Sequence, residues 1–433
     1  KTRNVRAIRR VTVASLSDYD VTGEGGLVWI KQRNQSQNHV LFDTERGATK
    51  ALVTNNSTAQ ATLSDGLTSF LPYGFQINDN ATTGASSDTY AAWAFKNTSG
   101  FFTCVSYTGN STNRTIAHDL GSVPGMMIIK SATSVEPWNI YHREINPGND
   151  PEDYYVHFGS DPRASGSDRW NGTAPTASVF SIGTSNEVNA NGETYIAYLF
   201  AHDDQSFGEG GNASVVNCGS YSGNGSTTGP VITLGWQPSF IIVKNTSHSE
   251  GWVMFDEMRG MHAGGEDKAL FPSQDTVEQD RATGHIWPTS TGFQIHGSSD
   301  TKINASGQTY MFLAIRVSDG VVSKPVTDPT KVFAMDTGDG STTIPAYTAG
   351  FPIDFMLEKA PGSTNSWYVS SRLSGNEFLE SNNANAKTSG GGDYIFDSSV
   401  GAIKGNWTNN HIGWMFKRHA GFDVVCDVGD GVS

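Results

Sequence analysis

The sequence predicts an all-β chain, and three observations lead to that class. Its apolar runs are short, rich in aromatic and β-branched residues, and separated by clusters of Gly, Ser, Thr and Asn, which is typical of strands and turns. Glycine supplies 48 of the 433 residues while charged residues make up only 17%, which excludes coiled coils and long helical bundles. Aromatic residues reach 11%, too many for an intrinsically disordered chain.

Charge, hydropathy and cysteine content narrow the class further. The net charge of −14 argues against binding to nucleic acid through its phosphates. No apolar run approaches the roughly 18 residues of a transmembrane helix, so no membrane span is predicted. Three cysteines cannot form a disulfide framework for a chain of this length. Cys104 and Cys218 stand in matching contexts, and we expect both to be buried apolar residues.

A pair of apolar runs recurs four times along the chain. The first run of each pair ends in a lysine, at Lys31, Lys130, Lys244 and Lys359, with steps of 99, 114 and 115 residues. The default expectation for the first three of these lysines is a solvated strand end. The second run opens at His39, Trp138, Trp252 and Trp367. We expect the three tryptophans to pack in a core.

Two further motifs recur in the same order. An aromatic strand, opened by Thr-Tyr in three of its copies, occupies residues 89–96, 194–201, 309–316 and 410–417. A hairpin-like junction containing Gly-Asn or Gly-Asp begins at Tyr107, Tyr221, Asp336 and Asp427. A period near 100–115 residues is too long for a solenoid or propeller blade and equals one small domain.

The repeat divides the chain into homologous modules arranged in tandem. We expect a basic arm at residues 1–17, four modules at 18–106, 107–220, 221–335 and 336–426, and the start of a further module at 427–433. Short strands separated by frequent turns predict a β-sandwich or barrel for each module. Unbroken runs such as FIIVK should be buried on both faces. Residues 45–53 leave a short helix and a short strand open.

The first ten residues depart from the acidic composition. They contain five basic residues, Lys1, Arg3, Arg6, Arg9 and Arg10. These side chains form a solvated arm or, on a second interpretation, an assembly arm that docks on an acidic neighbour.

No motif of catalysis or metal binding is found. The sequence lacks a nucleophile elbow, a zinc-protease motif and a phosphate-binding loop, so we predict no enzymatic activity and no cofactor. The acidic groups at Asp203, Asp204, Asp336 and Asp339 are interpreted as turn residues in preference to calcium ligands. Asp43 with Arg46, and Asp256 with Arg259, are expected to form local ion pairs.

Loops that differ between modules are the preferred place for a ligand surface. The longest run from residue 146 to 170 and from 261 to 287. Four aromatic residues in or beside them are candidates to face a sugar ligand: Tyr154, Tyr155, Trp170 and Trp287.

The amino-acid sequence of the repeat resembles a known family. The segments LVWIKQRNQSQNHVLFDTERGATKALVTN, DTYAAWAFK, LGSVPGMMIIK, GETYIAYLFAHDDQSFGEGG and CGSYSGNGSTTG are similar to a repeat domain of structural proteins of tailed bacteriophages, common in phages of marine bacteria and cyanobacteria. The similarity extends over nearly the whole chain after Asp18 and is weakest in the fourth module. It implies β-sandwiches of lectin-like (concanavalin or laminin-G) type and a tail-fibre or other virion protein. It implies no catalytic or binding residues.

These observations together give the expected function. We expect a tandem array of four homologous β-sandwiches of jelly-roll or lectin-like type, located on the virion, most simply as a tail fibre or appendage attached to host-surface glycan or envelope. A purely structural connector or decoration protein on tail or capsid is the alternative, and a polysaccharide-degrading tailspike is less favoured. Other virion proteins are expected partners, and fibre analogy favours a homotrimer.

Overall fold

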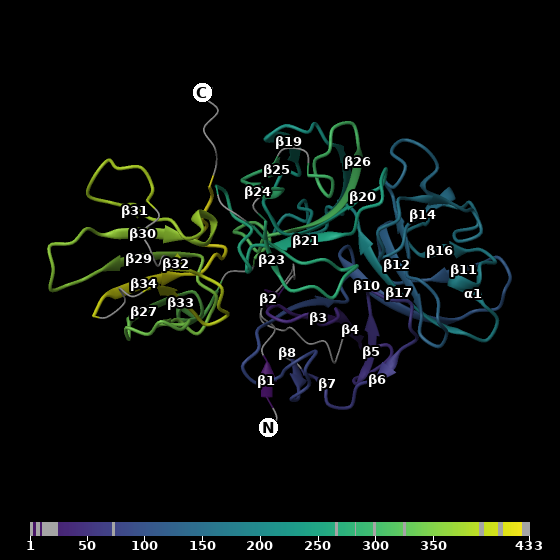
Figure 1. Cartoon of the computed structure of the whole chain (residues 1–433), viewed down its shortest axis with the longest axis horizontal. Coiled ribbons are helices and arrows are strands. Elements are labelled where there is room, and N and C mark those ends of the chain that lie inside the picture. Colours follow the sequence, from purple (N-terminus) through teal and green to yellow (C-terminus); the bar gives the residue numbers. More distant parts are fainter. Residues whose placement is uncertain are drawn as a thin grey trace.

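The computed structural model describes residues 3–5, 9–10, 25–71, 74–264, 267–281, 283–297, 300–323, 326–388, 394–405 and 410–426. It confirms the all-β class, with 41% of the chain in strands and 4% in helices. Within these described ranges, no helix has the length and apolar character needed to cross a membrane. The strands form four large sheets, here called L1 to L4, each accompanied by a small sheet, S1 to S4 (Figure 1).

Sheets L1 and S1 come from the first hundred residues. L1 has the order β2 (Arg9–Arg10), β9 (Tyr90–Lys96), β3 (Gly26–Gln32), β4 (Val40–Asp43), β5 (Lys50–Val53) and β6 (Ala61–Thr62). S1 has the order β1 (Arg3–Val5), β8 (Gly74–Ile77) and β7 (Leu67–Leu71). The β5 strand settles the choice left open for residues 45–53, because their second half is a strand.

Sheets L2 and S2 follow in the chain. L2 has the order β10 (Phe102–Thr108), β17 (Thr194–Ala201), β12 (Pro124–Ser131) and β13 (Asn139–His142). S2 pairs β11 (Arg114–Ala117) with β16 (Val179–Ile182). The connections contain the hairpin β14 (Tyr154–Tyr155) and β15 (Ala164–Ser165), the 3₁₀ turn η1 (Pro151–Asp153) and the short helix α1 (Asn186–Asn189).

Sheets L3 and S3 repeat this arrangement. L3 has the order β18 (Val216–Ser222), β26 (Thr309–Arg316), β20 (Pro238–Asn245) and β21 (Val253–Asp256). S3 has the order β19 (Thr228–Thr233), β25 (Gly292–His296) and β24 (His285–Thr289). A two-stranded sheet of β22 (Asp267–Ala269) and β23 (Gln279–Arg281) lies in the connection.

Sheets L4 and S4 complete the chain. L4 has the order β27 (Phe333–Thr337), β34 (Ile412–Phe416), β29 (Phe355–Lys359), β30 (Tyr368–Ser371) and β31 (Leu379–Glu380). S4 has the order β28 (Tyr347–Thr348), β33 (Gly401–Lys404) and β32 (Tyr394–Ile395). The 3₁₀ turn η2 (Pro329–Lys331) precedes β27, and the 3₁₀ turn η3 (Arg372–Ser374) follows β30.

The four large sheets share one strand order. In each, the last strand of the segment lies between the first and the second, and the third strand pairs with the second. All these pairs are antiparallel except β2 with β9, which is parallel. The strands β10, β18 and β27 straddle the expected boundaries at residues 107, 221 and 336, because each pairs along its length with the last strand of the segment that follows.

Each large sheet packs one face on its small sheet. Separate apolar cores fill these four spaces, and Phe75, Phe180, Phe293 and Tyr394 are among their buried residues. The apolar side chains that alternate along the strands of one face supply these cores, as expected for a sandwich.

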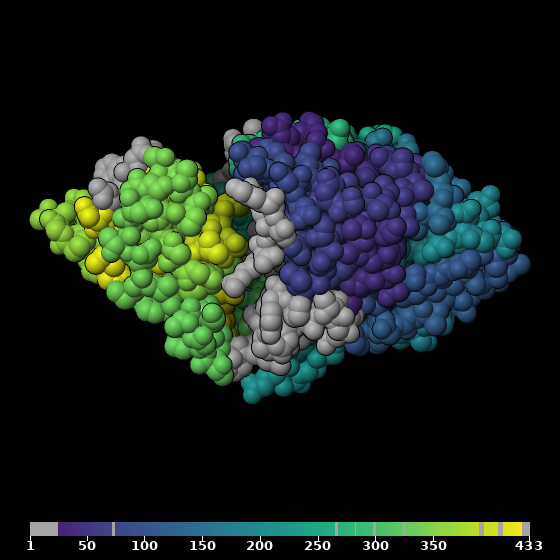
Figure 2. Space-filling view, turned by 90° about the horizontal axis from the view of Figure 1, so that it is seen from below, coloured from purple at the N-terminus to yellow at the C-terminus, as the bar shows by residue number. Residues whose placement is uncertain are grey.

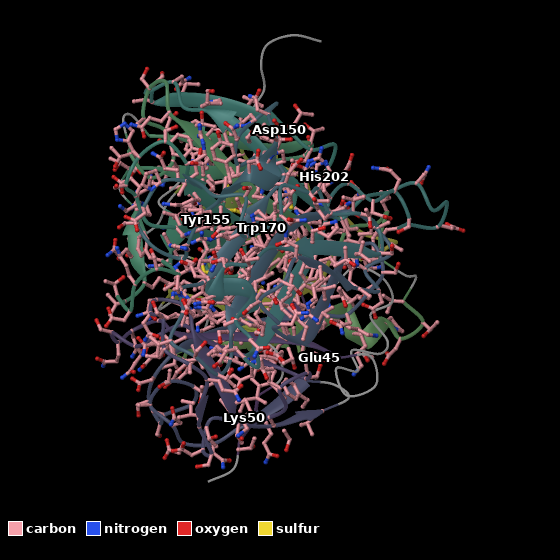
Figure 3. The ribbon with its side chains drawn as sticks, turned by 90° about the vertical axis from the view of Figure 1, so that its right-hand side faces the viewer. Glu45, Lys50, Asp150, Tyr155, Trp170 and His202 are labelled. Carbon is pink, nitrogen blue, oxygen red and sulfur yellow. The ribbon has the colours of Figure 1, made fainter. Side chains whose placement is uncertain are left out.

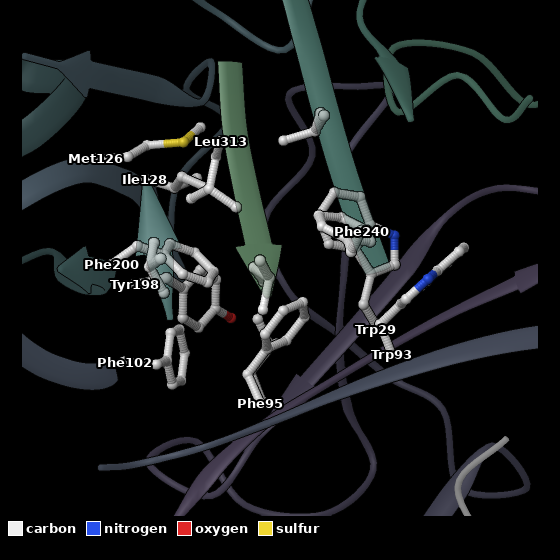
Figure 4. Close-up of a cluster of buried hydrophobic side chains, with 14 of the residues drawn as sticks. Trp29, Trp93, Phe95, Phe102, Met126, Ile128, Tyr198, Phe200, Phe240 and Leu313 are labelled. Atoms are coloured by element: carbon white, nitrogen blue, oxygen red, sulfur yellow. The ribbon is translucent and has the colours of Figure 1, made fainter. Parts of the chain in front are cut away.

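The other faces of L1, L2 and L3 meet in a fifth core, here called the central core (Figure 4). Trp29, Trp93 and Phe95 reach it from L1, Tyr198 and Phe200 from L2, and Phe240 and Leu313 from L3. Because both faces of these sheets are covered, β3, β12 and β20 are buried at every position. This confirms the expectation for the unbroken apolar runs.

Sheet L4 lies outside this arrangement. Figure 1 shows it as a separate lobe at the left, and Figure 2 shows the same lobe in the space-filling view. Along β29 the positions alternate between buried and half-exposed, so this run is not covered on both faces. The lobe is joined to the rest through ion pairs between Arg418 and Glu257 (3.7 Å) and between Arg33 and Asp397 (2.5 Å).

Candidate functional site

The expected ligand-facing residue Trp170 is instead part of a core. Its side chain is 1% exposed, and its Nε1 donates to the backbone oxygen of Tyr154 at 2.8 Å. The ring packs edge-on against Tyr141 between L2 and S2. Figure 3 shows Trp170 beside Tyr155 within the body of the molecule. The expectation of an exposed aromatic is therefore wrong for Trp170, because its loop folds back over the sheet.

The other three aromatic candidates are half-buried, and each has a neighbour on its ring. The guanidinium carbon of Arg163 lies 5.6 Å from the ring centre of Tyr154. That of Arg169 lies 4.1 Å from the ring centre of Tyr155. Trp287 belongs to β24 in S3, where its ring stacks on that of His296. The first three candidates thus share one segment beside L2, whereas Trp287 belongs to another sheet.

A half-buried polar cluster adjoins Tyr155, and sequence reasoning did not single it out. Glu187 accepts from Arg169 at 2.8 Å and lies 3.3 Å from the Nε2 of His157. Although desolvation acts in the opposite direction, hydrogen bonds from His157 and Arg169 lower the pKa of Glu187 to about 2. The carboxylate therefore stays ionised and paired at neutral pH, which suits a structural anion better than a proton donor.

The basic arm is partly paired within the chain. Arg3 lies in β1, which pairs with β8, and Arg9 and Arg10 form β2, which pairs with β9. Lys1 and Arg6 lie outside the described residues. Docking of this arm on an acidic neighbour stays a prediction.

Polar groups also bridge L1, L2 and L3 where these sheets meet. The Nε of Arg46 donates to Asp43 at 2.6 Å, and that carboxylate also accepts from the hydroxyl of Tyr198 in L2 at 2.7 Å. The equivalent pair in L3 has the same 2.6 Å distance from Arg259 to Asp256, which accepts from the Trp93 indole of L1 at 3.1 Å. Both expected ion pairs are present, and each extends to a neighbouring sheet.

The third such bridge uses a histidine in place of the aspartate. In the repeat, His142 of L2 occupies the position of Asp43 and Asp256. Its Nε2 lies 3.0 Å from the backbone oxygen of Phe312 in L3, and its Nδ1 accepts from the backbone N–H of Glu144. Burial lowers the pKa of His142 to about 3, so the ring is neutral at pH 7. The three bridges lead from L1 to L2, from L2 to L3 and from L3 back to L1.

Backbone hydrogen bonds follow the same cyclic order. They are Gln60 N–H to Ala132 O at 2.9 Å, Arg163 N–H to Thr246 O at 3.1 Å, and Glu278 N–H to Arg33 O at 2.8 Å. Each acceptor lies two residues beyond the lysine that ends the first run of its repeat. Three equivalent bonds at three equivalent positions indicate an approximate threefold arrangement of L1, L2 and L3, here called the ring.

Indole groups add a further contact to two of the three junctions. The Trp138 indole of L2 donates to the backbone oxygen of Val53 in L1 at 2.9 Å. The Trp252 indole of L3 donates to the backbone oxygen of His157, in the segment of L2, at 2.8 Å. At the third junction His39 replaces the tryptophan and accepts from Trp29 of its own sheet.

The recurrent lysines are buried inside the ring, which overturns the expectation of solvated strand ends. Lys31, Lys130 and Lys244 are 0% exposed. Each ammonium group donates to backbone carbonyl oxygens, including that of Asp275 for Lys31 and that of Ser160 for Lys244. Desolvation by burial lowers the pKa of all three to about 8.

The cysteines and tryptophans expected in a core are buried in the ring, but the tryptophan of L4 is not. Cys104 and Cys218 are free and buried, as expected, and burial raises the pKa of both thiols. Trp138 and Trp252 are buried in the central core, which confirms their expected role. Trp367 is 40% exposed, so the same expectation is wrong for L4. Over the described part of the chain, no group of three or more His, Cys, Asp or Glu side chains is placed to hold a metal ion.

Comparison with known proteins identifies one family. The model of a domain of unknown function (DUF7483) matches residues 12–318, a range that includes L3 and ends before L4. No curated protein matches the chain. A solved structure described as "Life in the extremes: atomic structure of Sulfolobus Turreted Icosahedral Virus" aligns with 50% of this chain and 90% of its own, at 10% identity and a TM-score of 0.18. A likeness at that score carries no argument about fold or function.

Proposed function

We propose that this chain, which belongs to the family of the domain of unknown function DUF7483, is a structural protein of a bacteriophage virion. In this proposal it is a tail fibre or similar appendage that attaches to the host surface. It is built as four homologous β-sandwich modules of jelly-roll or lectin-like type in tandem. The observation that carries the proposal is the strand order common to the four large sheets.

The pairing register supports the equivalence of the fourth module with the third. In L3, Ile242 of the second strand faces Leu313 of the last strand. In L4, Leu357 faces Trp414 at the matching positions. The sequence motifs and the strand register therefore agree over residues 355–359 and 412–416.

The recurring Thr-Tyr motif has the same contact in three modules. The hydroxyl of its tyrosine accepts from the backbone N–H of the residue five positions earlier. The three bonds are Ala85 to Tyr90 at 2.9 Å, Ala190 to Tyr195 at 2.9 Å and Ala305 to Tyr310 at 2.8 Å. In the fourth module His411 replaces the tyrosine and contacts Glu358, which accounts for the weaker repeat there.

A modular chain of this kind suits an appendage. Repeated sandwiches multiply equivalent surfaces on one chain, and several weak sites acting together can raise binding by roughly 10²–10⁴-fold. The likeness of the repeat to phage structural proteins points the same way. A connector or decoration protein is the second candidate, favoured by the short basic segment at the start of the chain. A polysaccharide-degrading tailspike is the least supported.

Labelling of intact particles tests the virion assignment. Antibodies raised against the purified chain should label the tail of particles of the encoding phage in electron micrographs. Label on the capsid would favour the decoration role, and absence of label from disrupted and intact particles would reject the assignment.

Host attachment is tested separately. Fluorescently labelled chain should bind cells of the phage's host and compete with adsorption of the particles, whereas cells of a resistant strain serve as control. Release of oligosaccharide from host polysaccharide would show that the chain degrades the polysaccharide, which would favour the tailspike role over attachment without catalysis. Absence of cell binding would remove the receptor-binding part of the proposal.

A further inference from the structure

The outward face of L4, turned away from S4, differs from the same face of the other large sheets. Its strands β29 and β34 alternate between positions buried against S4 and half-exposed positions, and β27 alternates between half-exposed and exposed ones. The open positions are apolar at nearly every site. They include Phe333, Met335, Phe355, Leu357, Trp367, Val369, Leu379, Ile412, Trp414 and Phe416. We call this set the L4 outer face.

Matching positions in the ring are all inside the central core. The equivalents of Phe355, Leu357 and Trp367 in L3 are Phe240, Ile242 and Trp252. These three L3 residues are 3% exposed or less. In L4, by contrast, Trp367 is 40%, Leu379 49% and Met335 57% exposed. An exposed cluster of this size is typical of an interaction surface.

The L4 outer face is only partly covered by its own chain. Phe422 stacks on Phe416 at 5.1 Å between ring centres and lies 5.9 Å from Phe355. Further along the face, Trp367 stacks on Trp414 at 5.2 Å. The exposed fraction of Trp367 shows that this pair leaves an indole open to solvent.

The ring shows what packs on such a face. Three sheets with this strand order place their outward faces around one axis and close a common core, with cyclic hydrogen bonds at the rim. The L4 outer face has the chemistry for the same packing. Lys359 at its edge already donates to a backbone carbonyl, that of Ser363, as the ring lysines do. Because Lys359 is held at the edge by its own loop, its charge lies at the rim of the face, outside the apolar centre.

We propose that the L4 outer face docks on the same face of two further copies of this chain, forming a threefold homotypic core. This inference rests on the proposed equivalence of the fourth module with the other three, and not on the virion assignment. Closed threefold symmetry buries each face completely and leaves no open edge that could propagate a filament.

The ring also specifies one contact of the assembled trimer. Trp138 and Trp252 each donate their indole N–H to a backbone oxygen of the neighbouring sheet, at Val53 and His157. The strand register makes Glu380 the L4 equivalent of these acceptors, because Val369 faces Leu379 as Leu41 faces Leu52. The Trp367 indole of one copy therefore donates to the backbone oxygen of the partner's Glu380.

Mass measurement on the full chain tests the inference. Light scattering after size exclusion, and sedimentation velocity across a wide concentration range, should give three times the mass of one chain. Trp367→Glu and Met335→Lys should each reduce the mass to that of one chain. Because both side chains are open to solvent in the single chain, these substitutions leave its cores intact, which circular dichroism and melting curves verify.

The matched control is Ile395→Lys, on S4, which is 50% exposed but lies outside the L4 outer face. It should leave the trimer unchanged. A wild-type chain that is monomeric throughout, or that forms another stoichiometry, would overturn the proposal. So would a trimer that persists in both L4 variants. Particle labelling is independent of mass in solution, so failure of the trimer and failure of the virion assignment are distinguished.

Discussion

At the scale of single residues, the ring depends on a few buried charges that are satisfied across sheet boundaries. Arg259 is the clearest case. It pairs with Asp256 at 2.6 Å and Glu278 at 3.0 Å, and its guanidinium carbon lies 5.3 Å from the ring centre of Trp93. One cation therefore pairs with two carboxylates, the second of which it shares with Arg33, and contacts a neighbouring sheet.

Removal of that cation should be costly. We expect Arg259→Leu to lower the free energy of unfolding by about 3–5 kcal/mol, because the carboxylate of Asp256 would lose its paired cation in a largely buried site, whereas Glu278 keeps its ion pair with Arg33. Urea denaturation monitored by tryptophan fluorescence measures the loss. Lys268→Ala is the control in the same segment, since the side chains of Lys268 and its partner Asp280 are 39% and 57% exposed and solvent-accessible pairs contribute less than about 1 kcal/mol. Equal losses in the two variants would contradict this account.

The buried histidine of the ring should make its stability depend on pH. The pKa of His142 is about 3 in the folded chain and about 6.5 when unfolded, so the unfolded chain binds more protons between these values. Stability is therefore full above pH 6.5 and falls as the pH drops toward 3, by about 2 kcal/mol between pH 7 and pH 5 from this residue alone. His142→Asn, which does not titrate, should flatten that part of the profile.

Unfolding free energies measured at several pH values test this dependence. Wild type and His142→Asn should differ in slope between pH 7 and pH 5 and agree in slope above pH 7. Parallel profiles over the whole range would show that His142 is not the responsible group.

At the scale of strands and turns, the junction glycines set how closely two segments approach. A Cβ added at Gly223 would lie 2.3 Å from the backbone oxygen of Ala305, and one at Gly109 would lie 2.1 Å from that of Ala190. These are the same position in two copies of the sequence repeat, facing the turn that precedes the Thr-Tyr strand. The glycine of each Gly-Asn junction is therefore needed for two reasons: it allows the turn to form, and it lets the backbone of the facing turn approach closely.

We expect Gly223→Ala to destabilise the chain by about 1–3 kcal/mol, because backbone rather than a flexible side chain occupies the space. Gly362→Ala provides the comparison, since nothing lies within 4 Å of its Cβ position. Thermal melting should show a clear decrease for the first and a change near zero for the second. A neutral Gly223→Ala would mean that the turn at Ala305 can yield.

The sequence was sufficient to predict strands, turns and repeats, because these depend on local periodicity and on motifs such as Thr-Tyr. It was not sufficient to predict which sheet faces meet. Lys31 reads as a solvated strand end, yet it is buried because backbone carbonyls of its own and another segment accept its ammonium protons. Trp170 was a candidate ligand residue because its loop differs between the repeats. Only the folded loop shows that its indole donates to the backbone oxygen of Tyr154.

The difference between Trp252 and Trp367 teaches the same lesson. They occupy one position of the repeat, yet one is buried and the other is exposed. Their environments are set by neighbouring sheets that are distant in sequence. No difference marks the outward positions, which are apolar in both FMLEK and FIIVK, and the charged residue of FMLEK, Glu358, is buried on the opposite face of the sheet.

At the scale of the whole molecule, the ring should be the smallest unit that folds stably. Its central core draws side chains from L1, L2 and L3 together, and the cyclic hydrogen bonds close only when all three are present. A fragment that lacks L3 would expose the apolar faces of L1 and L2, and exposed faces of this kind promote aggregation. The sheet L4 has its own core with S4 and does not contribute to the central core.

Truncation distinguishes the ring from a string of independent domains. A fragment ending at residue 323 should unfold in one cooperative transition and keep the protection of the β12 and β20 amides against hydrogen exchange. A fragment ending at residue 206 retains L1 and L2 intact in sequence, and it should bind a hydrophobic dye strongly and aggregate. Independent domains would instead give a soluble shorter fragment whose melting temperature matches that of the longer one. The cause of the expected difference is physical: buried on both faces, β3 and β12 have no polar face to present to water once L3 is gone.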